Sequence, residues 1–141
     1  ALACAFKAAI YTALGEAIAR LPAAPERRLL SQIRRDLPVR EALDWIEGHL
    51  GEDCSNAAIA LHMRVGSDQC IRRFRRWLGQ TPAEYVQERR VAAAARDLAY
   101  GDDPIEAIAA RYGFPNRHYF SRVFVRRMGQ PPAAYRRAHG L

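Results

Sequence analysis

Cysteine is scarce in this 141-residue chain, and Cys4, Cys54 and Cys70 form no C-x-x-C pair. This spacing excludes a disulfide framework and a zinc ribbon, and it suits a reducing compartment such as the cytoplasm. The four histidines show no metal-ligand spacing with these cysteines. We therefore assign no metal and no cofactor.

Long apolar runs are also missing, because no stretch of 18 residues lacks a charge. The most apolar window, residues 2–21, is interrupted by Lys7, Glu16 and Arg20. A membrane-spanning helix needs about 20 mostly apolar residues, so we expect no membrane contact, and a secretory layout is absent as well. The sequence shows no nucleophile-base pair, carboxylate dyad or phosphate loop, so we expect no enzyme.

Lysine is nearly absent: of the 22 basic residues that give the chain its net charge of +7, 21 are arginine. No acidic residue follows Glu106, whereas seven arginines do: Arg111, Arg117, Arg122, Arg126, Arg127, Arg136 and Arg137. The planar guanidinium matches phosphates and guanine edges, so nucleic acid is the leading partner. A codon bias that favours arginine is the alternative interpretation.

The hydrophobic pattern predicts an all-α chain, since helical periodicity recurs throughout and no run alternates with period two. An apolar stripe from Leu2 to Ile18 predicts a first helix, and residues 26–35 predict a second. A third begins at Pro38 and is expected to end at Gly51.

A repeat then appears: FRRWLGQTPAEY at residues 74–85 recurs as FVRRMGQPPAAY at 124–135, identical at seven of twelve positions. An Ile-Ala pair precedes each copy. Each copy therefore belongs to a unit with one shared architecture, at about residues 55–79 (the first unit) and 103–129 (the second unit).

Each unit has the pattern of a helix-turn-helix, in which a short helix, a tight turn and a longer helix end at Gly79 or Gly129. Ser55 and Asn116 are predicted helix caps. Asp103, Pro104 and Glu106 predict a capping box with proline at the first helical position. Residues 82–99 predict one continuous helix between the units. Its length of roughly 27 Å lets tandem units address neighbouring turns of a DNA groove, about 34 Å apart.

Helical geometry turns the large apolar residues of the two long helices inward, among them Cys70, Phe74, Phe120 and Phe124. Cys70 is expected to be a small buried hydrophobe, with a reactive sensor thiol as the alternative. The outward side chains and their flanks are the candidate DNA contacts: Asp68, Gln69, Ile71, Arg72, Arg75, Arg76, Arg117, His118, Ser121, Arg122 and Arg126.

An exposed arginine recurs at one place in both units, Arg72 and Arg122, and arginine binds guanine O6 and N7 in bidentate fashion. Ile71 suits contact with a thymine methyl group, and Asp68 is placed to orient Arg72 or to accept a hydrogen bond from cytosine. The alternatives are an ordinary surface ion pair for Asp68 and a solvent-exposed side chain for Ile71. The remaining arginines near the helix ends suit phosphate.

The segment DPIEAIAARYGFPNRHYFSRVFVRRMGQPPAAYRR resembles the signature of the AraC/XylS family of bacterial transcription regulators, and the resemblance covers about residues 38–138. It implies two helix-turn-helix subdomains on a linking helix, recognition helices in successive major-groove segments, and activation through RNA polymerase. The first unit departs from the family pattern at Arg64, Gly66 and Cys70, and Asp97 replaces an apolar residue in the linking helix.

Residues 1–37 lie outside the resemblance, and the chain begins with Ala rather than Met. This segment is either the remnant of a sensor or dimerisation domain, giving a homodimer contact, or a cover for the DNA-binding domain. The combined prediction is a sequence-specific regulator that binds double-stranded DNA; a helical protein-interaction or RNA-binding module is the alternative.

Overall fold

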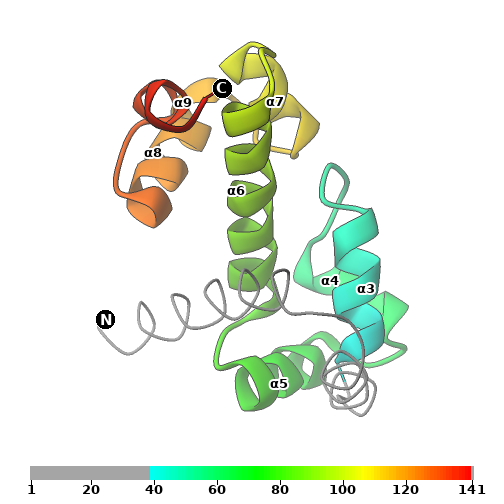
Figure 1. Ribbon diagram of the computed structural model, residues 1–141. Helices are drawn as coiled ribbons and strands as arrows, with labels where there is room; N and C mark the ends of the chain where they lie inside the picture. The colour runs from blue at the N-terminus through cyan, green and yellow to red at the C-terminus, as the bar shows by residue number, and fades with distance from the viewer. Residues whose placement is uncertain (1–38, 141) are drawn as a thin grey trace, which may run out of the picture. The chain divides into compact units, whose positions relative to one another are not determined.

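The computed structural model describes residues 39–140, which are helical and contain no strand (Figure 1). The all-α prediction is confirmed for this part of the chain. The helices are α3 (Arg40–Gly48), α4 (Asn56–His62), α5 (Ser67–Leu78), α6 (Pro82–Tyr100), α7 (Ile105–Arg111), α8 (Arg117–Met128) and α9 (Pro132–His139). The helices expected before residue 38 lie outside the described residues.

The linking helix α6 is the axis of the described fold. It ends one residue beyond the predicted range, and Figure 1 shows α5 at one end of it and α7, α8 and α9 around the other. Its apolar side buries Val86 and Val91 and continues through Ala94 to Leu98. Both helix-turn-helix units thus pack on one rigid element.

Three phenylalanines fill the core of the second unit. Phe114, Phe120 and Phe124 lie within a cluster that also contains Val91 and Leu98 of α6. The ring centroids of Phe120 and Phe124 are 5.4 Å apart in an edge arrangement, which favours aromatic pairs. This cluster fixes α8, and with it the outward face of α8, against α6.

In the core on the side of the first unit, Cys70 and Phe74 of α5 have no exposed surface. Ile46 of α3 and Ile59 of α4 are also fully buried. The predicted burial of Cys70 is confirmed, and its thiol lies 3.7 Å from the Met63 sulfur.

Predicted boundaries are confirmed at α4, α5 and α8. Ser55 Oγ accepts a hydrogen bond from the Ala58 amide and Asn116 Oδ1 from the Tyr119 amide. Gly79 and Gly129 end α5 and α8 with φ of 71° and 78°, a left-handed conformation that glycine adopts without a Cβ clash.

Two boundaries differ from the prediction. The expected capping box at Asp103 is wrong, because Pro104 is the N-cap of α7 and no side chain caps it, while the Asp103 carboxylate binds Arg111. Helix α3 ends at Gly48 rather than at the expected Gly51. The next residue, His49, is the C-cap, and its Nδ1 lies 2.6 Å from the Trp45 carbonyl oxygen. Helix α9 was not predicted.

Arg64 holds a strained conformation in the turn of the first unit. Its φ of 55° matches that of Gly113 (69°), which occupies the equivalent turn of the second unit. A side chain in the left-handed region costs about 1–2 kcal/mol, partly offset in a glycine variant by greater freedom of the unfolded chain. We expect Arg64→Gly to raise the free energy of unfolding by about 0.5–1 kcal/mol, measured by urea denaturation. A lower stability would contradict the strain.

Glu84 links the stability of α6 to pH. Its carboxylate accepts hydrogen bonds from the Thr81 amide (2.7 Å) and hydroxyl (2.9 Å), and these bonds lower its pKa below 4.5. A lowered pKa in the folded state gives stability that is present above the unfolded-state value and is lost as the pH falls through the folded-state value. Glu84→Gln is therefore expected to destabilise the chain at neutral pH, and its difference in stability from the native chain is expected to shrink as the pH falls and Glu84 becomes protonated. Urea midpoints across this range would test it; a pH-independent difference would contradict it.

Candidate nucleic-acid interface

Helix α5 presents its polar residues on the side opposite Cys70 and Phe74. Asp68, Gln69 and Arg72 are exposed, as are Arg75 and Arg76 nearer the C-terminal end of the helix. Ile71 is half-buried, so only part of it is available to a thymine methyl. Gly66 caps the helix through its backbone alone, and the helix starts at Ser67.

Helix α8 repeats this arrangement in the second unit. Arg117, His118, Arg122 and Arg126 are exposed, and Ser121 is half-buried. Phe120, Val123 and Phe124 hold the opposite side of the helix in the core. The sequence-predicted site residues therefore form two separate surfaces, one on each of the helices α5 and α8.

Arg72 and Arg122 keep their guanidinium groups available. Within residues 39–140 neither side chain forms an ion pair, and no such contact joins Arg72 to Asp68. The Arg122 guanidinium carbon lies 5.9 Å from the centroid of the Tyr119 ring, a distance compatible with a cation–π contact. No ion pair with residues 39–140 occupies either guanidinium, so their donors are available to an incoming acceptor as far as this part of the chain is concerned.

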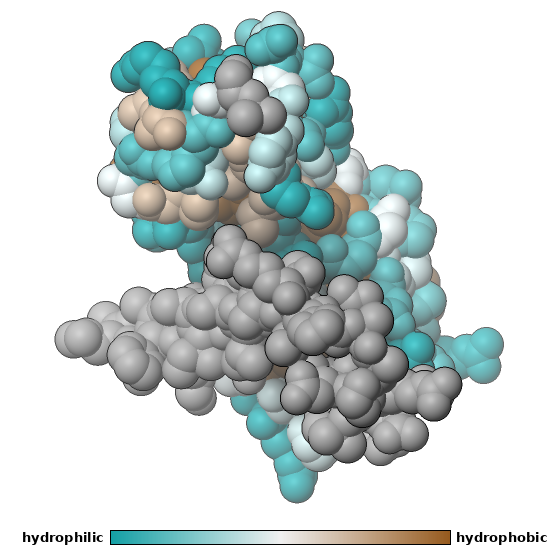
Figure 2. Space-filling model, in the orientation of Figure 1, coloured by the Kyte–Doolittle hydropathy of each residue, from teal (hydrophilic) through white to brown (hydrophobic). Residues whose placement is uncertain are grey.

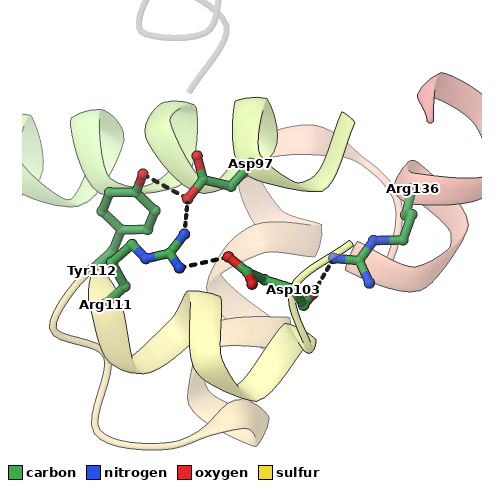
Figure 3. Close-up of polar contacts among 5 residues, drawn as sticks. All are labelled: Asp97, Asp103, Arg111, Tyr112 and Arg136. Atoms are coloured by element: carbon green, nitrogen blue, oxygen red, sulfur yellow. Dashed lines mark hydrogen bonds and ion pairs between the residues drawn. The ribbon is translucent and has the colours of Figure 1, made fainter. Parts of the chain in front are cut away.

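Other arginines of the basic C-terminal stretch are used inside the fold (Figure 3). Arg111 donates to the carboxylates of Asp97 (2.6 Å) and Asp103 (2.5 Å), which raises the pKa of its guanidinium. Tyr112 donates to the same Asp97 oxygen at 2.9 Å, and Arg136 donates to the Asp103 carbonyl at 2.5 Å. Asp97, which departs from the family pattern, thus joins α6 to the end of α7.

Arg127 is also engaged, since its guanidinium lies 3.9 Å from the Glu88 carboxylate of α6. Arg111, Arg127 and Arg136 are among the seven C-terminal arginines from which the sequence predicts nucleic acid as the leading partner. The structure corrects this for these three residues, because protein groups partner all three.

The surface in Figure 2 is mainly hydrophilic over the described residues that it shows, with small apolar areas between the hydrophilic ones.

The described cysteines are free and buried, and burial raises the pKa of both the Cys54 and the Cys70 thiol. A raised pKa keeps the thiol protonated and unreactive, which disfavours the sensor alternative for Cys70. Residues 39–140 contain no cluster of three or more groups that could hold a metal ion. None of the helices in this range is long and apolar enough to cross a membrane.

The role of Arg90 was not predicted from the sequence: this residue lies at the centre of α6, between the α3–α4 loop and the second unit. It donates hydrogen bonds to the carbonyl oxygens of Leu50, Glu52 and Gly113. The signal was present in the sequence, because Arg90 falls four residues from both Val86 and Ala94 on the buried stripe of α6. A cleft of about 490 Å³ lies beside it.

Comparison with known proteins agrees with this arrangement. A family model described as a helix-turn-helix domain matches residues 59–138. The chain is 37% identical to the uncharacterized HTH-type transcriptional regulator YbfP of Bacillus subtilis over 98 residues, which are 70% of this chain and 33% of that protein. The regulatory protein SoxS of Salmonella typhimurium is 31% identical over 70% of this chain and 92% of its own length.

A solved structure is similar in fold as well. The DNA-binding domain of AdpA, described as a global transcriptional factor in complex with a target DNA, superimposes with a TM-score of 0.68 and 32% identity. The match covers 72% of this chain and 91% of that domain. The chain spans about a third of the length of the first relatives, such as YbfP. On the matched residues and the paired helix-turn-helix units, the chain belongs to the AraC/XylS family of transcription regulators, which are DNA-binding proteins and not enzymes.

Proposed function

We propose that this chain is a sequence-specific regulator of transcription that places α5 and α8 in successive major-groove segments of double-stranded DNA. The observation that carries the proposal is the pair of exposed arginines, Arg72 and Arg122, at equivalent places on two helices that one rigid helix connects. The similarity to a DNA-binding domain solved with its target DNA supports the same conclusion.

The side chains divide by what they are placed to contact. Arg72 and Arg122 lie in mid-helix, where a recognition helix faces base edges, and each is assigned to a guanine. Gln69, His118 and Ser121 flank them as further base contacts, while Asp68 and Ile71 adjust the preference next to Arg72. Arg75, Arg76, Arg117 and Arg126 lie towards the helix ends and are assigned to phosphates, which adds affinity without sequence preference.

The wider role follows from the family. Activation requires contact with RNA polymerase, and we include that contact in the proposal. Homodimerisation through residues 1–37 or through a sensor domain is the proposed means of combining two such chains. A bacterial regulator of this kind acts in the cytoplasm, where free cysteines remain reduced.

Selection of binding sites from a random duplex pool tests the proposal. We expect enrichment of a motif with two guanine-containing segments about one helical turn apart, and an affinity that falls steeply with salt because lysine and arginine displace counterions. A matched RNA duplex should compete only weakly. Absence of an enriched DNA motif, with capture of RNA at physiological salt, would overturn the proposal.

A further inference from the structure

The loop between α3 and α4, which leads into the first unit, meets the second unit at a point outside the linking helix. Arg90 of α6 donates from Nε to the Leu50 carbonyl at 2.8 Å and from a terminal nitrogen to the Glu52 carbonyl at 2.7 Å. Both carbonyls belong to the loop between α3 and α4, on the side of the first unit. The other terminal nitrogen donates to the Gly113 carbonyl at 3.4 Å, in the turn between α7 and α8 of the second unit.

Glycines make this approach possible on both sides. A Cβ at Gly51 would lie 2.5 Å from the Arg111 backbone oxygen, so the α3–α4 loop meets the end of α7 directly. A Cβ at Gly113 would lie 2.9 Å from an Arg90 nitrogen. Gly51 and Gly113 therefore admit contacts that no other residue would allow without movement. We call Arg90, Gly51 and Gly113 the inter-unit lock.

The lock adds a second attachment to the one that α6 supplies. Packing on α6 fixes each unit through its own core side chains. The Arg90 guanidinium binds carbonyls from both sides, and because arginine donates in a fixed, planar geometry, it holds the two sides at one separation. One base pair more between two sites shifts the second by about 3.4 Å and about 35°, so a fixed pair of units tolerates little change in spacing.

We propose that the inter-unit lock determines the spacing between the two DNA segments that the chain recognises, with Arg90 as its positioning residue. The inference rests on the proposed function, because spacing has meaning only if both α5 and α8 engage DNA. Arg90 acts here through the relative placement of the two helices and contacts no base itself.

The test uses the full chain and duplexes that carry its selected motif with one base pair inserted or deleted between the two segments. Arg90→Met removes the donors and keeps the apolar stem. Gly51→Ala leaves Arg90 intact and wedges the α3–α4 loop away from α7. Arg89→Met is the matched control, since the neighbouring Arg89 binds Glu47 of α3 and forms no hydrogen bond or ion pair with the described residues of the second unit.

The native chain and Arg89→Met are expected to lose at least about tenfold in affinity when the spacing changes by one base pair, a loss comparable to a mismatch in the site. Arg90→Met and Gly51→Ala should lose less than about threefold, with a modest drop at the native spacing because preorganisation is reduced. Circular dichroism and the urea midpoint establish that each variant is folded. If one of the two variants, Arg90→Met or Gly51→Ala, does not fold, the spacing preference of the other tests the inference.

Spacing discrimination by folded Arg90→Met or Gly51→Ala as sharp as that of the native chain would overturn the inference. Equal relaxation in Arg89→Met would also overturn it, because the effect would then follow from loosening α6 in general. Failure of the proposed function is distinguishable, since the native chain would then show neither a motif nor a preferred spacing.

Discussion

Replacing Phe124 by alanine is expected to lower the free energy of unfolding by about 3–5 kcal/mol, the usual cost of removing a fully buried phenylalanine. Phe124 has no exposed surface, and its ring lies 5.4 Å from the ring centroids of both Phe120 and Tyr135. It therefore joins α8 to α9 within the cluster that packs on α6. Collapse of the cavity is opposed because each of these helices is held by other contacts.

Urea denaturation followed by circular dichroism measures this loss. Val125→Ala is the matched control on the neighbouring position, which is 40% exposed, and it should change stability by less than about 0.5 kcal/mol. A loss below about 1 kcal/mol for Phe124→Ala would contradict the assignment of Phe124 to the core.

Tryptophan fluorescence adds a second readout. The two tryptophans of the chain, Trp45 in α3 and Trp77 in α5, both lie on the side of the first unit. Because α6 contributes to the cores on both sides, the fluorescence and dichroism transitions of the native chain should coincide, and Phe124→Ala should shift both together. Separate transitions would show that the two units unfold independently.

The fold was predictable where a local rule decides the outcome. Ser55 and Asn116 cap helices because their side chains accept amide hydrogen bonds, and Gly79 ends a helix because it adopts a positive φ. Asp103 obeys the same capping rule in sequence but binds Arg111 instead. A tertiary ion pair thus replaced a local cap, which no pattern within the segment could reveal.

The candidate site was predictable as a surface but not as a set of available charges. Periodicity placed Arg72 and Arg122 opposite the core, and the structure agrees in their exposure. Arg111 and Arg136 looked equivalent in sequence, yet their partners, Asp97 and the backbone of Asp103, lie at the far end of α6 and in the following loop. Which arginine is free depends on contacts between elements, and net charge does not contain that information.

Replacing Arg72 or Arg122 by alanine is expected to cost about 1–3 kcal/mol on the selected duplex and to relax base preference at one position in each case. The reason is that neither guanidinium forms an ion pair within residues 39–140, and the proposal assigns each of them to guanine O6 and N7. Arg126→Ala, at the end of α8, should instead weaken binding about equally on all sequences and reduce the salt slope by about one unit. Arg96→Ala, on the exposed side of α6, should change neither the affinity for DNA nor the base preference.

The double variant Arg72→Ala/Arg122→Ala is expected to lose about 2–6 kcal/mol, the sum of the single losses, because distant groups without shared partners act additively. Competition titrations with the selected and a scrambled duplex measure both affinity and preference. Equal losses on the two duplexes would demote Arg72 and Arg122 to phosphate contacts. A double loss much larger than the sum of two small single losses would instead mean that the two helices do not engage DNA at the same time, because either helix could then bind in place of the other.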